Sequence, residues 1–506
     1  MRNPPAPRAA GVDDIAIYVP RHFLPVEALA RARGIEPAKL TEGLGLTAMA
    51  LPDVFEDTAT MAANAVRELI ERNGLEPEEI GRIYLGTESA LDGAKPTSTY
   101  VLEALRGYYA PRYGDDCLTR CDVVDLTFAC IGVVDALLAT VDWVAAGEGR
   151  VGIVVASDYA KYELGSTGEY TQGAGAVALL VRESPALLSV LPEVGVATRG
   201  VHDFFKPVRY VAKSALVEEV AAYAGTELDA AAVVTAADRD LAQRGVLDAT
   251  DERIGLYRIT PTFDGPYSNL SYRRRVRDAY AHYREQTERG DDGQPLFAWS
   301  RIAMHLPYAA HGRRMLMDLF VTELQRRGEW ADIAAASRLG AAPEEGDFDS
   351  PGAFEDAWSS YLRAVGRTPA YRSFAEQQLA GTADASSLVG NLYAGSIFLA
   401  LASTLARAAE AGDQLAGKSL GLIAYGSGSK AKVLSVAVRG RWEGRVGRWR
   451  LFERLESRKG VEYDTYERLH RGRLTDPLRP PSGTFALDRI GEEPNKEGAR
   501  YYRWVA

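Results

Sequence analysis

Cysteine is scarce in this sequence of 506 residues, which contains only Cys117, Cys121 and Cys130. An odd and sparse set does not build a disulfide framework. Cys117 and Cys121 are four residues apart, but no second Cys/His pair completes a tetrahedral zinc site. The six histidines show no metal-ligand spacing. We therefore expect neither a metal site nor a fold that depends on disulfides.

The sequence also has no long basic run. Its 59 Lys and Arg residues stand against 69 Asp and Glu residues, which gives a net charge of −10. Binding to nucleic acid usually needs a concentrated basic face, so we expect none. A phosphorylated small molecule stays possible, because it needs only a local cluster of positive charge.

Targeting and membrane signals are weak. Residues 1–11 lack the apolar run of a signal peptide. The uncharged stretch 385–406 is long enough to span a bilayer. Its Asn391, glycines and serines instead favour a loop followed by a buried helix. We therefore predict a cytoplasmic protein that does not bind membranes.

What the sequence does contain is an alternation of apolar strand patterns with amphipathic helical patterns. Helices are predicted at 60–73 and 131–146, where apolar residues recur at helical spacing. Near-continuous apolar runs are typical of strands that are buried on both faces. Strands are predicted at 15–19, 83–86, 122–127, 151–156, 175–181, 419–424 and 433–438. This pattern predicts an α/β protein with a layered core.

Composition changes in three segments. Residues 212–251 are rich in Ala, Glu and Asp, which predicts a helical insertion. Residues 326–356 predict a helix followed by a polar loop. After Arg439 the chain is Arg-rich and mixed in pattern, and we interpret it as a peripheral extension.

Cys130 lies between a predicted strand and a predicted helix. A thiol at a helix N-terminus feels the positive end of the helix dipole, which lowers its pKa and favours the thiolate. A thiolate there could form a thioester with an acyl donor. The alternative is an inert buried cysteine in an apolar run.

Three further positions follow predicted strands. Glu88 could serve as a general base and His305 as an electrophilic donor, although each could equally be an ordinary loop or structural residue. The backbone of the loop at Gly426 could hold an oxyanion, or the loop could be a simple turn. Taken together, the four positions supply the groups that acyl transfer requires.

The same loop loosely fits a dinucleotide-binding pattern, GxGxxG/A. We discount NAD, because residues 432–438 predict a strand where that motif needs a helix. No acidic residue ends a second strand about twenty residues later.

Nine stretches of the sequence together resemble 3-hydroxy-3-methylglutaryl-CoA (HMG-CoA) synthases, which are condensing enzymes of the thiolase fold. The stretches occur in the order found in that family and cover most of residues 11–440. They are residues 86–95, 128–132, 157–162, 169–178, 203–207, 263–268, 305–308, 389–396 and 425–428.

The resemblance implies a thiolase-like layered αβαβα sandwich of two similar halves, usually assembled as a homodimer. The N-terminal half, residues 1–205, would carry Glu88 and Cys130. The C-terminal half, residues 206–440, would carry His305 and Asn391, with insertions near 212–251 and 326–356. Residues 441–506 would form a C-terminal extension.

The resemblance also implies an activity, the condensation of acetyl-CoA with acetoacetyl-CoA and water to HMG-CoA and CoA in the mevalonate pathway of isoprenoid biosynthesis. Cys130 would carry the acetyl group. Glu88 would act as general acid and base, and His305 would polarise the ketone of acetoacetyl-CoA. No cofactor beyond the CoA thioester substrates is expected.

Six further residues are expected to bind substrate. The first five match positions that line the substrate in the family: Tyr162, Thr171, Ser268, Asn391 and Ser427. The sixth is Arg314. The family often has a Lys facing the CoA phosphates where this chain has Ala310, and Arg314 could take that role, because Arg binds phosphate bidentately. A solvated surface Arg is the alternative.

Three other functions remain to be weighed. A related enzyme of polyketide β-branching would share the three catalytic residues but act on acyl carrier protein substrates. A type III β-ketoacyl carrier-protein synthase lacks a Glu at the Glu88 position, and its His motif differs from residues 305–308. A catalytically inactive assembly subunit is disfavoured, since all three catalytic residue types are present.

Overall fold

The computed structural model describes residues 10–239, 252–287, 295–493 and 495–506. Its centre is a nine-stranded sheet with the order β13-β14-β15-β8-β1-β7-β6-β4-β5. Two strand sets meet where β1 pairs with β8 at only two residue pairs. The strands are β1 (Ala10–Tyr18), β4 (Ile80–Gly86), β5 (Asp122–Leu126), β6 (Val151–Ala160), β7 (Gly173–Glu183), β8 (Leu188–Thr198), β13 (Arg301–Met304), β14 (Ser419–Gly426) and β15 (Lys430–Val438).

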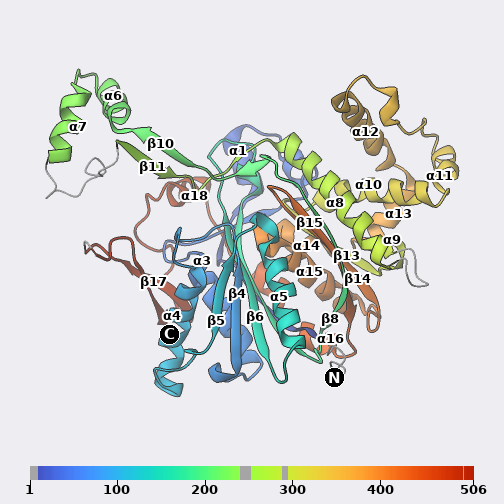
Figure 1. The fold of residues 1–506 in the computed structure, drawn as a ribbon, viewed down its shortest axis with the longest axis horizontal. Helices are drawn as coiled ribbons and strands as arrows, with labels where there is room; N and C mark the ends of the chain where they lie inside the picture. The colour runs from blue at the N-terminus through green and yellow to red at the C-terminus, as the bar shows by residue number, and fades with distance from the viewer. Residues whose placement is uncertain (1–9, 240–251, 288–294, 494) are drawn as a thin grey trace, which may run out of the picture.

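Helices form the other layers (Figure 1). α3 (Thr58–Arg72) and α4 (Thr97–Tyr113) cover the outer face of the β4–β7 half. α5 (Gly132–Ala145) and α15 (Ser396–Ala411) lie between the two strand sets. α8 (Gly265–Thr287) covers β8 and β15, and α10 (His311–Arg326) packs beside it. The result is the layered αβαβα arrangement that the resemblance implied.

The predicted strands and helices are all present, with ends that differ by a few residues. α3 begins two residues earlier than predicted, because Asp57 caps it: the Asp57 carboxylate accepts the N–H of Thr60 at 2.9 Å. The uncharged stretch 385–406 ends in a buried helix, α15, as expected, but its first residues belong to the short helix α14 (Asp384–Val389) and only residues 390–395 form the connecting loop. Among the described residues, no helix is both long and apolar enough to span a membrane.

The three candidate catalytic residues each follow the carboxyl end of a strand. β4, β5 and β6 are parallel, and β13 is parallel to β14. Glu88 follows β4, Cys130 follows β5, and His305 follows β13. Carboxyl ends of parallel strands share one edge of a sheet, which is where α/β proteins bind their ligands.

The insertion at 212–251 is helical, as predicted, in its described part. It contains α6 (Lys213–Ala224) and α7 (Ala230–Arg239), while residues 240–251 lie outside the described residues. A two-stranded ribbon of β10 (Val208–Ala212) and β11 (Arg253–Tyr257) carries it away from the sheets (Figure 1). The sequence had not indicated this ribbon.

The second insertion contains α11 (Trp330–Ala336) and then an irregular segment, as predicted. It continues into α12 (Pro351–Val365) and α13 (Pro369–Gln378). The remaining elements are short or peripheral. They are β2 (His22–Pro25), α1 (Val26–Arg33), α2 (Pro37–Thr41), β3 (Ala48–Leu51), β9 (Phe204–Phe205), β12 (Thr262–Phe263), α9 (Pro295–Ala298) and α14 (Asp384–Val389).

The C-terminal segment after Arg439 is not peripheral, and that prediction is wrong. Trp442, Tyr466 and Phe485 in this segment are fully buried. Its mixed pattern reflects short elements, several of which place one or two side chains in the core. They are α16 (Trp442–Val446), α17 (Leu451–Glu456), β16 (Lys459–Gly460), α18 (Tyr463–His470), β17 (Thr484–Ile490) and β18 (Arg500–Val505).

Its arginines are structural as well. Arg448 Nη2 and Trp449 Nε1 both donate to the buried Asp14 carboxylate of β1, each at 2.8 Å. Arg445 Nη2 donates to Asp13 at 2.8 Å. The last seventy residues therefore complete the first strand of the fold, because a buried carboxylate needs partners of this kind.

We predict that Trp442→Ala lowers the free energy of unfolding by about 3–5 kcal/mol, since it removes a fully buried indole. Its exposed neighbour offers a matched control, and Arg441→Ala should change that energy by less than about 0.5 kcal/mol. Urea denaturation of the full chain measures both. Equal stability of the two variants would show that the segment is peripheral after all.

Candidate active site

A cavity of about 410 Å³ lies at the strand ends described above. It collects eight of the nine residues singled out from the sequence, which come from segments up to 297 positions apart. These are Cys130, Tyr162, Thr171, Ser268, His305, Arg314, Asn391 and Ser427. The ninth, Glu88, lies beneath the surface of the cavity in contact with Cys130. A volume of this size is ordinary for a small-molecule site.

Cys130 lies in a single 3-10 turn, Ala129–Ile131, that leads into α5. Its Sγ donates to Glu88 Oε1 at 3.2 Å. The sequence predicted a lowered pKa for this thiol, and that prediction is wrong. Burial raises the pKa of Cys130, and the Glu88 carboxylate raises it further, so the protonated thiol is the resting form. Activation therefore requires a base that takes the proton.

Glu88 is suited to that task. It is only partly exposed, and burial raises its carboxyl pKa to about 7, although the nearby Lys206 ammonium opposes the shift. Lys206 Nζ also donates to the Glu88 carbonyl oxygen at 2.9 Å, which fixes the loop. A carboxylate with a pKa near neutrality can both accept and return a proton at physiological pH.

The buried carboxylate of Asp158 positions Glu88. Its Oδ1 accepts the Glu88 N–H at 3.0 Å and the Thr87 hydroxyl at 2.8 Å. Its Oδ2 accepts the N–H of Ala394 at 3.0 Å. One side chain therefore ties the loop after β4 to the segment before α15, in the other half of the fold.

His305 is buried, and burial lowers its imidazole pKa to about 3, so the ring is neutral. Its Nδ1 lies 2.6 Å from Ser396 Oγ, and Ser396 Oγ also accepts the N–H of Leu306 at 2.9 Å. The Tyr272 ring stacks beside the imidazole, and the Tyr272 hydroxyl donates to the His305 carbonyl at 3.0 Å. These contacts hold the ring in one orientation.

Aromatic side chains surround the thiol. Tyr162 makes edge contacts with Phe263 and Tyr393, at centroid distances of 5.5 and 6.2 Å. Phe204 packs against the same three rings. This apolar wall excludes water and causes the burial that shifts the nearby pKa values.

Asn391 reaches the cavity because the chain turns sharply before it. Gly390 has φ +85°, and a Cβ there would lie 1.9 Å from the Gln172 carbonyl oxygen, so only glycine fits. The Asn391 N–H donates to the Thr171 carbonyl at 2.9 Å, which places these two predicted residues side by side.

The loop at Gly426 is a turn between the antiparallel strands β14 and β15, and whether it also holds an oxyanion stays a prediction. The Gly428 N–H donates to Asp203 Oδ1 at 2.9 Å, and the Ser429 N–H donates to the Arg199 carbonyl at 2.6 Å. Those amides are therefore already occupied. Gly426 permits close packing instead, since a Cβ there would lie 2.9 Å from the Phe128 carbonyl oxygen.

Arg314 lies at one wall of the cavity, fixed by the Gly43 carbonyl at 2.7 Å and the Tyr308 hydroxyl at 3.2 Å. Beside it, His311 is buried, and among the described residues neither of its ring nitrogens has a hydrogen-bond partner. Burial holds the His311 pKa well below its usual range. Sequence reasoning assigned His311 no role.

Several other residues that shape the site had no assigned role either, although they fall within the stretches that carried the resemblance. They act by positioning, which a single sequence signals only through the motif around them. They are Asp158, Phe204, Lys206, Phe263, Tyr393 and Ser396.

Family models match two parts of the chain. One is described as hydroxymethylglutaryl-coenzyme A synthase N terminal and matches residues 6–185. The other, described as hydroxymethylglutaryl-coenzyme A synthase C terminal, matches residues 257–471. Between the matches lie β8 and the ribbon with its helical insertion.

Individual proteins are also similar to this chain over nearly its whole length. The hydroxymethylglutaryl-CoA synthase of Haloferax volcanii is 31% identical over 91% of each chain. That of Schizosaccharomyces pombe is 26% identical over 95% of this chain and 96% of its own. A solved structure of MvaS in complex with 3-hydroxy-3-methylglutaryl coenzyme A superposes with a TM-score of 0.73 at 29% identity, covering 99% of this chain and 100% of the other.

We predict that Glu88→Gln accelerates alkylation of Cys130 by iodoacetamide at pH 8. The neutral amide removes the charge that raises the thiol pKa, and each unit of pKa restored increases the thiolate fraction about tenfold. Mass spectrometry of the peptide that contains Cys130 measures the rate, with Cys130→Ala as the unreactive control. Slower alkylation in Glu88→Gln would show that the carboxylate activates the thiol already at rest.

Proposed function

Since the chain belongs to the hydroxymethylglutaryl-CoA synthase family, we propose that Glu88, Cys130 and His305 perform the condensation that defines this family. The enzyme joins acetyl-CoA, acetoacetyl-CoA and water to give HMG-CoA and CoA, a reaction of the mevalonate pathway. One observation carries the assignment of residues. Cys130 Sγ lies 3.2 Å from Glu88 Oε1, and the pKa of this carboxyl group is about 7. Cys130 and His305 both line the same cavity.

The first step is acetyl transfer. Cys130 Sγ attacks the thioester carbonyl of acetyl-CoA as Glu88 Oε1 accepts the thiol proton. The carbon–sulfur bond to CoA breaks, and Glu88 returns the proton to the departing CoA thiolate. The thiol's high pKa keeps it protonated until substrate is bound.

The second step forms the carbon–carbon bond. Glu88, again ionised, removes a proton from the acetyl methyl on Cys130, and the resulting carbanion attacks the ketone carbon of acetoacetyl-CoA. The ketone oxygen becomes a hydroxyl by taking back that proton from Glu88. Water then attacks the thioester on Cys130, which releases HMG-CoA and restores the thiol.

His305 stabilises the ketone oxygen as charge develops on it. With the Ser396 hydroxyl hydrogen directed to Nδ1, the ring proton lies on Nε2, which is then a hydrogen-bond donor. The low pKa keeps this donor neutral, so it polarises the ketone without transferring a proton early. Ser396 is thus a positioning residue.

The remaining predicted residues hold the two thioesters. We assign Arg314 to a CoA phosphate, because its guanidinium lies at the cavity wall and is bonded only to neutral oxygens. We propose that the acyl and pantetheine groups contact five residues that line the cavity: Tyr162, Thr171, Ser268, Asn391 and Ser427. The three steps use side chains and water alone, so we propose that the enzyme needs no cofactor.

Assembly and location are further proposals. We propose a homodimer, which light scattering of the purified protein would test. We also propose a cytoplasmic enzyme. Its support is that all three cysteines are free thiols and that a relative from Cricetulus griseus, 25% identical, is named as cytoplasmic.

We predict that variants of Cys130 and Glu88 separate acetyl transfer from condensation. Cys130→Ala should form no acetyl-enzyme. Glu88→Gln should still accept acetyl from acetyl-CoA, but more slowly, because the thiol proton must then pass to solvent instead of to Glu88. The same variant should condense at least about a hundredfold more slowly, because the acetyl methyl then has no base. Intact mass and the loss of acetoacetyl-CoA absorbance measure the two steps. Acetylation without turnover in the wild type would point to a carrier-protein substrate, and wild-type condensation by Glu88→Gln would disprove the assigned base.

We predict that the condensation rate falls about tenfold per pH unit below pH 7. The carboxyl pKa of Glu88 is raised to about 7, so the ionised base is lost as pH falls through that value. Single-turnover condensation by pre-acetylated enzyme measures this limb. Glu163→Gln, at an exposed carboxylate outside the cavity, should leave the profile unchanged. A limb near the ordinary glutamate pKa would contradict the burial of Glu88.

A further inference from the structure

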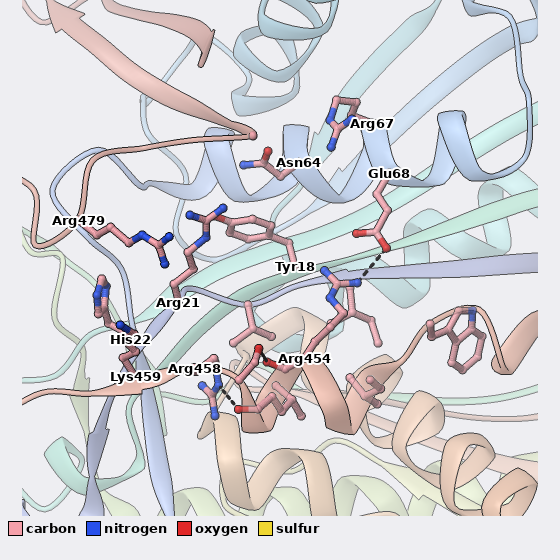
Figure 2. A pocket seen from close by; sticks show the side chains of 17 residues that line it. Tyr18, Arg21, His22, Asn64, Arg67, Glu68, Arg454, Arg458, Lys459 and Arg479 are labelled. Atoms are coloured by element: carbon pink, nitrogen blue, oxygen red, sulfur yellow. Dashed lines mark hydrogen bonds and ion pairs between the residues drawn. The ribbon is translucent and has the colours of Figure 1, made fainter. Parts of the chain in front are cut away.

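A second cavity, of about 370 Å³, shares no lining residue with the active site. It lies between the end of β1, the start of β2, one side of α3 and the segment around α17 (Figure 2). Its volume falls in the range of small-molecule sites. Neither the family matches nor the reaction described above gives it a role.

Positive charge lines this cavity. Six of its described residues are Arg or Lys, and Glu68 is the only carboxylate among them. The six are Arg21, Arg67, Arg454, Arg458, Lys459 and Arg479. The concentration is unexpected in a chain whose net charge is −10.

Two of the six cations are in ion pairs. Glu68 accepts from Arg454 at 2.8 Å, and Arg67 is paired with Glu71. Arg21 donates to the Ser482 carbonyl oxygen at 2.7 Å. Within the described part of the chain, no ion pair joins the side chains of Arg21, Lys459 or Arg479 to a carboxylate, although Asp53 and Glu56 lie near Arg21 and Arg479. Three cations therefore face the cavity without an ion pair of their own.

Arg458 is the least solvated of these cations. Burial lowers the pKa of Arg458 to about 10, because the charged guanidinium is less stable away from water. Its guanidinium donates to the carbonyl oxygens of Leu388 and Leu455, at 2.6 and 3.0 Å. Its Nη1 is buried and has no partner among the described residues. An anion in the cavity would satisfy that donor.

His22 adds an independent observation. Its side chain is 9% exposed, and its Nδ1 is buried with no hydrogen-bond partner in the described structure. The nearest carboxylate oxygen, on Asp53, lies 3.9 Å away, beyond hydrogen-bond distance. Buried polar atoms normally have a partner, so this one indicates a ligand or water that the cavity holds.

The cations occupy two ends of the cavity. Figure 2 shows Arg21, His22, Lys459 and Arg479 grouped at one end, and Arg67 and Arg454 toward the other. Backbone pairing confirms the first group, since Lys459 N donates to the Arg21 carbonyl and Lys459 pairs with His22. Apolar side chains complete the lining: Ile17, Val19, Trp449, Leu451 and Leu455.

We propose that this cavity binds a small molecule bearing at least two linked phosphate groups, such as a diphosphate ester. Arg and Lys are the residues that bind phosphate through charge-assisted hydrogen bonds, and the three cations without an ion pair, Arg21, Lys459 and Arg479, match the negative charge of two linked phosphate groups. The apolar lining offers a surface for the organic part. Nucleic acid fits less well, because the charge is concentrated in a cavity rather than along an exposed stripe.

Calorimetric titration of the full-length protein with inorganic pyrophosphate tests the proposal. We expect a dissociation constant below about 1 mM at low salt, weakening as salt is added. Arg21→Ala, Lys459→Ala and Arg479→Ala should each weaken binding about tenfold, because each removes a charge-assisted contact. Lys459→Arg should retain affinity. Thermal melts confirm that each variant is folded.

Two controls locate the site. Arg441→Ala, at an exposed position outside the cavity, and Arg314→Ala, in the active site, should both bind pyrophosphate as the wild type does. Tighter binding of ADP than of pyrophosphate would identify a nucleotide ligand, and equal binding would show that the diphosphate alone is recognised. The proposal fails if pyrophosphate does not bind at millimolar concentration. It also fails if only Arg314→Ala weakens binding.

Discussion

The active site depends on one buried carboxylate, that of Asp158. It accepts hydrogen bonds from the loop that carries Glu88 and from Ala394, in the segment that carries Asn391 and Ser396. These two segments come from different halves of the fold, and a shift of either would take partners away from a buried charge. The position of Glu88 relative to the segment that carries Asn391 and Ser396 is therefore fixed by a group that is not among the residues lining the cavity.

Burial shifts the pKa of all three catalytic groups, because it disfavours the charged form of each group. It raises the pKa of Glu88 to about 7, lowers that of His305 to about 3 and keeps Cys130 a thiol. The free enzyme thus holds a protonated thiol, a neutral imidazole and a carboxyl group that is about half ionised at pH 7, beside the aromatic wall around Tyr162. Of the three groups, only Glu88 gains or loses its charge near neutral pH.

Much of this could be predicted from the sequence, because strand and helix patterns here are strong and the catalytic residues directly follow strands. The position of Cys130 was evident, but its pKa was not. Helix position is a local property, whereas the opposing effect of Glu88 arises from a residue 42 positions away. The bond of the Gly428 amide could not be predicted for a similar reason, since its acceptor, Asp203, is 225 residues away along the chain. Short elements around Trp442 have no clear period, so their burial could not be inferred.

The contacts of Arg445 and Arg448 with Asp13 and Asp14 have a consequence for biosynthesis. Asp14 also accepts hydrogen bonds from Arg72 and Asn73, and Asp13 accepts the Ala186 N–H, so part of this network comes from residues that the ribosome makes early. The donors that complete it follow more than four hundred residues later. The set of partners around the first strand is therefore finished only when the C-terminal segment has emerged. A chain truncated before Arg445 would lose part of the hydrogen bonding that holds the beginning of the fold.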